Sequence, residues 1–330
     1  MKFHASVFAA AVAAFLSACG GSGDSPAPPS NGTQSVAITA ANQAAVARAT
    51  VNGGFSLALV QDETSNGATT SPNSTVVAER LLQHVLRAAV NQRRSIASTS
   101  AHPDSGSSET DPCGVSGTLT SNWNDVDNNS QLSGGDILTA NFQQCQDTPT
   151  LSVNGSVTIT LTGSPTESQF TGNAVFASVV AVYGGVTYTL NGAVAVSETD
   201  TDTLSSSSFT VGSTGLTVGI ASTGYTDSIA FDSGMVAASS FLAGSSSLTL
   251  TGSFTSQSLG GRVTISTPQA LMQQNGDAFP SQGSVLITGA SGSTLLVTAL
   301  NTTQVQLQVD ANGDGTVDST TTTTWPALIP

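Results

Sequence analysis

The sequence predicts a mainly β fold: a large antiparallel meander sheet, either a curled sheet or an open barrel, with an N-terminal amphipathic helix packed on it. Three observations lead to this prediction. Apolar and polar residues alternate with a period of two through most of residues 115–325. Glycines interrupt the alternation at intervals too short for crossover helices. Ahead of this region, residues 74–96 show helical spacing instead.

The alternation is clearest in residues 151–161, 186–196 and 305–309, where apolar residues fall on one face and mostly small or polar residues on the other. This pattern is typical of half-buried antiparallel strands. Two short echoes occur without a fixed period: ITLTG at 159–163 with LTLTG at 248–252, and VNG at 153–155 with LNG at 190–192. Consecutive strands should pair as hairpins, with breaks expected at glycines 163, 184–185, 212, 224, 234, 244, 260–261 and 289.

The amphipathic helix is predicted over Ser74 to Ile96. Its apolar residues recur at helical spacing, and arginines lie elsewhere around the turn. We expect it to cover one face of the sheet; a helix lying on a membrane surface is the alternative, but it lacks an aromatic anchor. A shorter helix is expected from Ala40 to Thr50, with Thr39 as its N-cap. Residues 97–112 are expected to be a flexible connection.

The first 18 residues have the organisation of a signal peptide. Lys2 supplies the charge, an apolar run follows, and small residues precede Cys19. The sequence Leu-Ser-Ala-Cys at 16–19 resembles the lipobox of bacterial lipoproteins. That resemblance implies cleavage before Cys19 and lipid on its thiol. Because Gly20 replaces the aspartate that retains such proteins at the inner membrane, it also implies an outer-membrane anchor, on either the periplasmic or the surface face.

The resulting organisation has four parts. Residues 1–18 are the lipoprotein signal peptide, and residues 19–34 are a tether rich in glycine, serine and proline, which cannot bury enough apolar surface to order itself. Residues 35–112 are the helical front segment with its linker. Residues 113–330 are the antiparallel β domain. An ordinary secretory signal, with Cys19 unmodified, is the alternative interpretation of the leader.

Two further cysteines, Cys113 and Cys145, predict a disulfide, because an even pair in an exported chain is usually bridged. Strands at 115–123 and 137–144, joined by a loop at 125–136, would bring the two cysteines roughly opposite one another. Closing a chain loop of this size stabilises a fold by about 3 to 4 kcal/mol. A metal or redox role is the alternative, but no CxxC motif or nearby histidine supports it.

The chain is acidic, with a formal net charge of −14 at pH 7. Residues 101–330 contain 17 acids and one cation, Arg262. A surface of this sign repels phosphate backbones, so we expect no nucleic-acid partner. It attracts divalent cations, although acidity also serves simply to keep a protein soluble.

Residues 125–136, DVDNNSQLSGGD, have the spacing of an EF-hand-type calcium loop. Ser130 stands where glycine usually makes the sharp turn, and the acid at the last position is a short aspartate. The flanking segments are predicted strands rather than helices. Asp, Asn and Gly also build hairpin turns without metal. The candidate ligands are Asp125, Asp127, Asn129, the Gln131 carbonyl, Ser133 and Asp136.

A second acidic loop, DANGDGTVD at 310–318, resembles the calcium loops of dockerin-like and thrombospondin-type repeats. It has glycine at the turn, Gly315, but lacks an acid at position 12, where Thr321 stands. A turn without metal is again the alternative. Its candidate ligands are Asp310, Asn312, Asp314, the Thr316 carbonyl and Asp318.

No catalytic residue is predicted. After the leader the only histidines are His84 and His102, outside the β region, so a histidine-dependent triad or zinc site is not expected there. Glu198, Asp200 and Asp202 would share a strand face, which leaves carboxylate-dependent glycan hydrolysis as a minor alternative. A solvated acidic edge that discourages aggregation is the preferred interpretation.

Residues 113–325 resemble uncharacterised β-rich outer-membrane lipoproteins of proteobacteria. The shared features are the lipobox, a cysteine-bracketed hairpin with an acidic loop, and FPSQGSVLITG followed by VDANGDGTVD. The resemblance implies no activity. Two functions stay open: a non-enzymatic structural or binding module, and a carrier for a lipid or other apolar ligand. The expected partner is the membrane, through Cys19; an apolar ligand, a glycan or an envelope protein stays open.

Overall fold

The computed structural model describes residues 34–57, 107–166, 169–200, 204–242, 244–274 and 276–329. The leader, the tether up to residue 33, and the helix predicted over 74–96 therefore lie outside the described residues. Gly32–Pro330 form one compact unit, so the described front segment and the β region belong to the same body. No helix in the described part of the chain is long and apolar enough to cross a membrane.

The fold is a single 15-stranded antiparallel sheet with a few helices, as predicted. Helix α1 is Gln43–Leu57, η2 is a 3-10 turn at Ala290–Gly292, and α3 is a single turn at Trp325–Leu328. The strands are β1 (Ser107–Pro112), β2 (Ser116–Asn124), β3 (Ile137–Thr148), β4 (Leu151–Leu161), β5 (Gln169–Tyr183), β6 (Val186–Asp200), β7 (Leu204–Ser222), β8 (Tyr225–Phe231), β9 (Val236–Leu242), β10 (Ser245–Ser256), β11 (Gly261–Gln274), β12 (Gln282–Thr288), β13 (Thr294–Ala299), β14 (Gln304–Asp310) and β15 (Ser319–Thr324).

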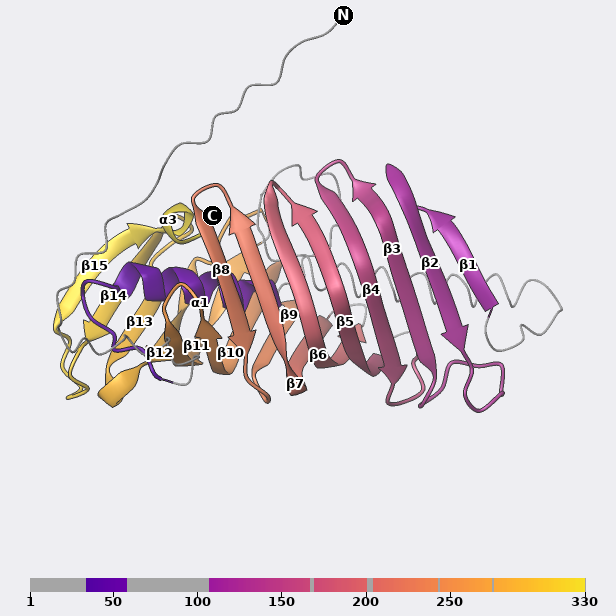
Figure 1. Cartoon of the computed structure of the whole chain (residues 1–330). Helices are drawn as coiled ribbons and strands as arrows, with labels where there is room; N and C mark the ends of the chain where they lie inside the picture. Colours follow the sequence, from indigo (N-terminus) through magenta and orange to yellow (C-terminus); the bar gives the residue numbers. More distant parts are fainter. Residues whose placement is uncertain are drawn as a thin grey trace, which may run out of the picture. The chain divides into compact units, whose positions relative to one another are not determined.

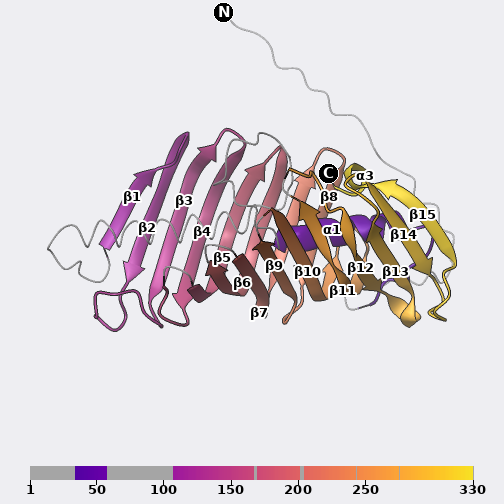
Figure 2. The same ribbon diagram turned by 180° about the vertical axis from the view of Figure 1, so that it is seen from behind.

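The strands follow one another across the sheet in chain order, so the predicted meander is confirmed. Strands β8 and β9 occupy one position in this order: β8 pairs with the second half of β7, β9 with the first half, and both pair with β10. The sheet curls around α1, and β1 and β15 remain at its two ends (Figures 1 and 2). Because these two strands do not pair with each other, the sheet is curled rather than closed.

The predicted apolar faces are the buried faces. The apolar residues of β4 are at most 3% exposed, and those of β6 and β14 are buried as well. The residues between them are mostly more exposed, which is the alternation expected of a sheet with one face in the core. The core members in these strands are Leu151, Val153, Val157, Ile159, Leu161, Val186, Tyr188, Leu190, Val194, Val196, Val305, Leu307 and Val309.

A row of β-bulges crosses the sheet. In β2, β4, β6, β10 and β12, a glycine with positive φ lies so close to the neighbouring backbone that an added Cβ would be 2.7 Å or less from a backbone atom. The strand register shifts at these places. Bulges bend strands and increase their twist, which accounts for the curl of this sheet. We call this row the bulge line; its glycines are Gly117, Gly155, Gly192, Gly252 and Gly283.

The bulge line corrects part of the sequence prediction. Gly212 lies inside β7 rather than at a break, and Gly234 separates the collinear strands β8 and β9 rather than forming a hairpin. The echo of VNG at 153–155 and LNG at 190–192 now has a structural meaning, because its glycines occupy equivalent bulge positions in β4 and β6. The bulges were missed because they depend on contacts between strands.

Helix α1 runs inside the curl of the sheet, between β7 and β8 on one side and β13 and β14 on the other (Figures 1 and 2). Every residue from 46 to 54 is buried except Arg48, which is partly exposed. A helix therefore packs on the inner face of the sheet, as the fold prediction requires. The described helix on the inner face is α1; the predicted helix at 74–96 lies outside the described residues and stays a prediction.

The bounds of α1 differ from the prediction of 40–50. The helix begins at Gln43, and a turn precedes it in which the Thr39 N–H donates to Asn42 Oδ1 (2.9 Å). It continues through Gly53 and Gly54 to Leu57 because these glycines lie against the sheet: an added Cβ would be 2.9 Å from Ile229 and 2.3 Å from Leu250. The glycines permit this approach, so tertiary contact outweighs their poor helix propensity.

The end of α1 is attached to the end of the chain. Asn52 Nδ2 donates to the Leu328 carbonyl (3.0 Å), and the Arg48 guanidinium donates to the Ala327 carbonyl (2.7 Å). Trp325 of α3 is fully buried, and its Nε1 donates to the Pro280 carbonyl (3.0 Å). The first and last described elements therefore meet in one core.

Residues 107–112 correct the predicted flexible connection of 97–112. They form the edge strand β1, which pairs with β2 from Ser107↔Trp123 to Pro112↔Thr118. This segment is polar and has no apolar alternation, so its own sequence does not indicate a strand. It is ordered by pairing with β2, the next strand along the chain.

Candidate functional site

The loop between β2 and β3 gathers the acids that the sequence singled out. Asp125, Asp127 and Asp136 each place a carboxylate oxygen within 4.8 Å of the others. Asp125 and Asp136 are buried, at 5% and 0% exposure, whereas Asp127 is exposed. Three carboxylates held this close repel one another, so a hard cation with oxygen ligands suits the arrangement.

Hydrogen bonds within the loop hold this geometry. Asp125 accepts from the Asn129 and Ser130 N–H groups (3.2 and 2.6 Å), and Asp136 accepts from the Val126 and Ser133 N–H groups (3.0 and 2.9 Å). The Ser133 hydroxyl donates to Asp127 Oδ2 (2.9 Å). A carboxylate has about four lone-pair sites, so acceptor capacity remains for an ion.

Ser130 adopts the turn that the sequence pattern assigns to glycine. Its φ is +60°, and Asn128 two residues earlier has φ +55°. The left-handed conformation costs a non-glycine residue on the order of 1 kcal/mol or more. The loop therefore makes the sharp turn despite lacking glycine, and the first departure from the EF-hand pattern does not change the backbone path.

The pKa of Asp127 lies below its ordinary value of 3.8. Desolvation is the largest single influence and would raise this pKa. The hydrogen bond from Ser133 and those with Asp125 and Asn129 act in the opposite direction and together outweigh it. These hydrogen bonds favour the ionised form of Asp127, which is the form that binds cations.

The loop between β14 and β15 repeats the backbone of the first loop. Gly313 and Gly315 have φ +75° and +85°, at the same two positions as Asn128 and Ser130. In both loops the first aspartate accepts from the N–H five residues later: Gly315 to Asp310 is 2.8 Å. In both, the last aspartate accepts from the second residue's N–H, here Ala311 to Asp318 at 2.8 Å. Two loops 185 positions apart thus share one turn.

The two loops differ in how closely they gather their acidic side chains. Among the described residues, Asp310, Asp314 and Asp318 do not form a cluster of three acids comparable to that of the first loop. Hydrogen bonds from the Thr316 backbone and from Asn312 lower the pKa of Asp314. The remaining predicted ligands, Asn312 and Thr316, lie in this same turn. The second loop is thus arranged primarily as a turn, and the first is the better candidate cation site.

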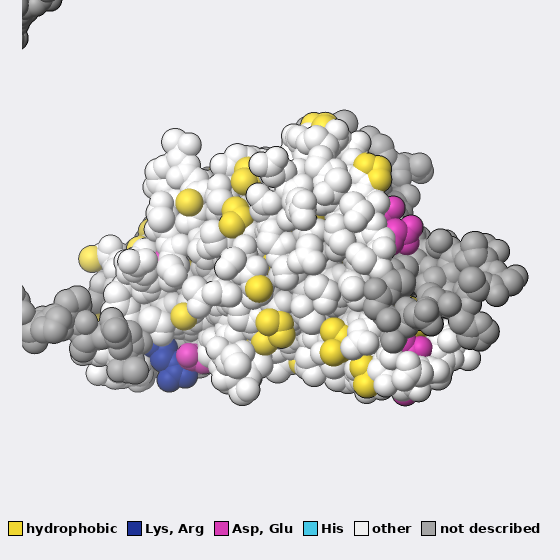
Figure 3. Space-filling view, turned by 45° about the vertical axis from the view of Figure 1, so that its right-hand side comes forward, with side chains coloured by type: hydrophobic (Ala, Val, Ile, Leu, Met, Phe, Trp, Pro, Cys, Tyr) yellow, Lys and Arg dark blue, Asp and Glu magenta, His cyan; other side chains and the backbone are white. Residues whose placement is uncertain are grey.

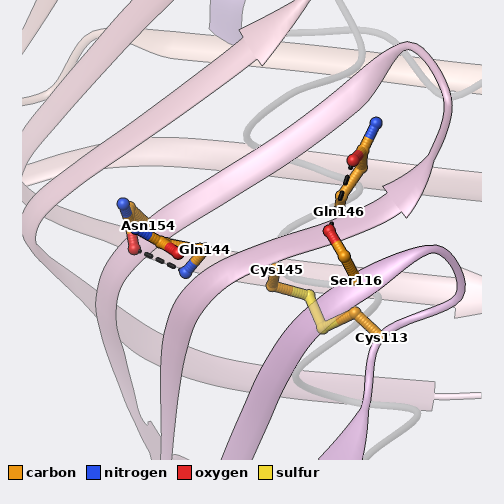
Figure 4. The surroundings of a disulfide bond; sticks show 6 residues. All are labelled: Cys113, Ser116, Gln144, Cys145, Gln146 and Asn154. Atoms are coloured by element: carbon orange, nitrogen blue, oxygen red, sulfur yellow. Dashed lines mark hydrogen bonds between the residues drawn. A yellow bond between two sulfur atoms is a disulfide. The ribbon is translucent and has the colours of Figure 1, made fainter.

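The predicted disulfide joins Cys113 and Cys145 (Figure 4). Cys113 follows β1, Cys145 lies in β3, and their Cα atoms are 5.4 Å apart. The bridge therefore connects three strands at one end of the sheet. Beside it, the Gln144 N–H donates to Asn154 Oδ1 (2.8 Å) at the bulge between β3 and β4 (Figure 4).

Comparison of the chain with known protein families, with curated proteins and with solved structures finds no match.

A polar cluster around Asp227 was not anticipated from the sequence. This buried carboxylate accepts from the Ser258 N–H and hydroxyl (2.9 and 2.8 Å), the Ser256 hydroxyl (2.7 Å) and the Tyr225 hydroxyl (3.1 Å). Arg48 of α1 lies over the Tyr225 ring, 5.6 Å from its centroid. The two serine partners, Ser256 and Ser258, lie 29 and 31 residues from Asp227 in the chain, so no local motif could reveal them. The cluster ties α1 to β8 and to the turn after β10.

The environment of Tyr225 indicates a structural role for this cluster. Burial raises the pKa of Tyr225 above its ordinary value, and the charge of Asp227 and the hydrogen bond to it act in the same direction. The hydrogen bond with Asn52 and the charge of Arg48 act against this rise. A tyrosine with a raised pKa stays neutral and donates its hydrogen bond, which makes it a poor general base at neutral pH.

Two other surface features of the described part suggest no chemistry. An open depression of about 290 Å³ at the β3–β4 and β5–β6 turns has no titratable residue in its lining. The face seen in Figure 3 is mostly uncharged, with apolar side chains scattered singly. Glu198 and Asp200 lie at the end of β6, while Asp202 is outside the described residues. The predicted grouping of the three acids on one strand face therefore lies only partly within the described residues.

Proposed function

We propose that this protein is an outer-membrane lipoprotein, anchored through lipid on Cys19, whose curled sheet is a non-enzymatic structural or binding module. The observation that supports it most is the Cys113–Cys145 bridge. Disulfides persist in oxidising compartments such as the bacterial periplasm and cell surface. With these two cysteines paired, Cys19 is the remaining cysteine of the chain, at the place where a lipobox requires one.

The packing inside the sheet supports a structural module over a carrier. A carrier needs an apolar cavity for its ligand. Here the space enclosed by β7 to β15 contains α1, whose Val46, Ala47 and Ala49 are fully buried. At Gly53 and Gly54 the helix lies directly against the sheet, because an added Cβ would be 2.9 Å from the Ile229 side chain and 2.3 Å from the Leu250 side chain. Between β7 and β15, the chain itself thus occupies the space inside the curl.

The anchor is tested by intact mass and membrane fractionation of the full-length chain expressed in a Gram-negative host. We expect a mature chain that begins at Cys19, carries three acyl chains, and sediments with the outer membrane. Gly20→Asp should move it to the inner membrane, and Cys19→Ser should remove the acyl mass. A chain that begins elsewhere or lacks acyl mass would refute the anchor. Stoichiometric co-purifying lipid, beyond the anchor, would favour the carrier.

Calcium at the first loop is part of the proposal. Its ligands would be Asp125, Asp127, Asn129, Ser133 and Asp136 with the Gln131 carbonyl, and the gathered carboxylates fit such an ion. The ion would hold the β2–β3 hairpin. Calcium at ten times its dissociation constant would add about 1.4 kcal/mol to the free energy of unfolding. The melting temperature, measured in chelator and in millimolar calcium, should then rise by roughly 3 °C.

A matched pair of variants locates the effect. Asp127 and Asp314 are both exposed, both have lowered pKa values, and lie in loops of the same backbone path. Asp127→Asn should abolish the calcium-dependent rise in melting temperature, and Asp314→Asn should leave it intact. An equal melting temperature in calcium and in chelator for the unmodified chain would make both loops plain turns.

A further inference from the structure

The two end strands of the sheet are protected to different degrees. In β1, Glu109 pairs with Ser121 and Asp111 with Leu119, both of which are buried inner-face residues. Glu109 and Asp111 therefore lie on the inner face, and β1 ends at a proline. Inward-pointing charges and proline are devices that prevent another strand from pairing with an edge. Strand β1 is thus closed to strand addition.

Strand β15 has none of these devices. Its sequence, STTTTT, contains no charge and no proline, and its register with β14 is unbroken from Gln304↔Thr324 to Val309↔Ser319. Four of its six residues are exposed and the other two are partly exposed. Threonine favours strands, so the segment is regular, extended and accessible.

The hydrogen-bond pattern shows which backbone groups are available. The Trp325 N–H donates to the Thr303 carbonyl (3.1 Å). Bonded and non-bonded pairs alternate along an antiparallel ladder. Residues 319, 321 and 323 therefore bond to β14, and the N–H and C=O groups of residues 320, 322 and 324 point away from it. These outward groups form a template for one more strand.

We propose that β15 pairs with β15 of a second copy of this chain, antiparallel and centred on Thr322. In this register Thr322 faces Thr322 of the other copy, and Thr320 faces Thr324. All the outward groups of one strand then meet those of the other, as a twofold axis requires. Threonine side chains would lie opposite one another, a pairing that stabilises strands.

Electrostatic repulsion favours antiparallel over parallel pairing of the two β15 strands. The acidic loop at 310–318 directly precedes β15. Antiparallel pairing places the two copies of this loop at opposite ends of a six-residue strand, about 20 Å apart. That distance exceeds the Debye length of about 8 Å at physiological salt. Parallel pairing would place the two acidic loops side by side, where they repel. A second copy also adds no charge to the interface, because β15 has none.

Disulfide trapping tests the register. In a full-length chain carrying Cys19→Ser, Thr322→Cys would place two thiols in a directly opposed pair, with Cα atoms about 5.5 Å apart and within bridging range. Thr324→Cys would leave its two thiols unpaired, because residue 324 of one copy faces residue 320 of the other, four residues along the strand. Copper-phenanthroline oxidation and non-reducing electrophoresis should show at least fivefold more covalent dimer for Thr322→Cys than for Thr324→Cys. Ser108→Cys, on the opposite edge, should stay monomeric. Equal trapping at 322, 324 and 108 would overturn the proposal.

A second pair of variants does not require trapping. Thr322→Pro removes an outward N–H and keeps the bonds to β14, whereas Thr321→Pro breaks one of those bonds. Sedimentation velocity should show a dimer for the unmodified chain and a monomer for Thr322→Pro, with a smaller loss of melting temperature than in Thr321→Pro. A Thr322→Pro chain that remains dimeric would overturn the proposal. So would an unmodified chain that is monomeric, including one that binds a strand of another protein at β15.

Discussion

Replacing Gly192 by alanine should lower the free energy of unfolding by about 3 kcal/mol or more. Gly192 belongs to the bulge line and has φ +129°, a conformation that L-residues rarely adopt. An added Cβ would lie 2.3 Å from the Gly215 carbonyl oxygen and 2.7 Å from the Leu216 Cα. Both atoms belong to the backbone of β7, so they cannot move aside without breaking the strand pairing. Urea denaturation followed by circular dichroism measures the loss.

Gly185→Ala is the matched control for this experiment. Gly185 also has positive φ, +86°, but lies in the β5–β6 turn with no atom within 4 Å of an added Cβ. We expect this variant to lose only about 1 kcal/mol, from backbone conformation alone. Equal losses for the two variants would mean that the close contact between β6 and β7 contributes nothing to stability. The bulge line would then require glycine only for its backbone conformation.

Removing the Cys113–Cys145 bridge should lower the free energy of unfolding by about 3 to 4 kcal/mol, because the bridge restricts the unfolded chain. The bridge closes a chain segment of 32 residues. The measurement is thermal unfolding of the unmodified chain with and without reductant, beside a Cys113→Ser, Cys145→Ser double variant. Reductant should lower the melting temperature of the first and leave the second unchanged. A reduced chain as stable as the oxidised one would show that the strand pairing alone holds this end of the sheet.

The strand pattern could be predicted because it is local. The inward residues of β4, such as Val157 and Ile159, follow from alternation alone, and glycines such as Gly185 and Gly224 do lie at turns. The extension of α1 through Gly53 and Gly54 could not be predicted, because its cause is contact with β8 and β10. The sequence prediction ended this helix at Thr50, whereas the glycine pair continues it against the sheet.

The candidate site, too, could be predicted in part from the sequence. Spacing alone identified Asp125, Asp127 and Asp136, and the structure brings them together. Spacing also treated Ser130 as a weakness, but its backbone takes the required turn. The opposite happened in the second loop: it has the expected glycine, yet its acids do not gather in the same way. The second loop has Asn312 where the first has Asp127, and its last aspartate stands at position 9 rather than at position 12.

The position of α1 has a consequence for how the chain folds. This helix is near the start of the sequence, yet it is bonded to residues near the end: Asn52 to Leu328 spans 276 positions. Contacts of such long range close only after most of the intervening chain has been placed, which makes folding slow. Helix α1 leaves the ribosome or a translocation channel long before the strands that surround it, β7 to β15, have formed. Until α3 arrives, the apolar surface of α1 is open to chaperones, and a chain cut short before residue 325 cannot complete its interior.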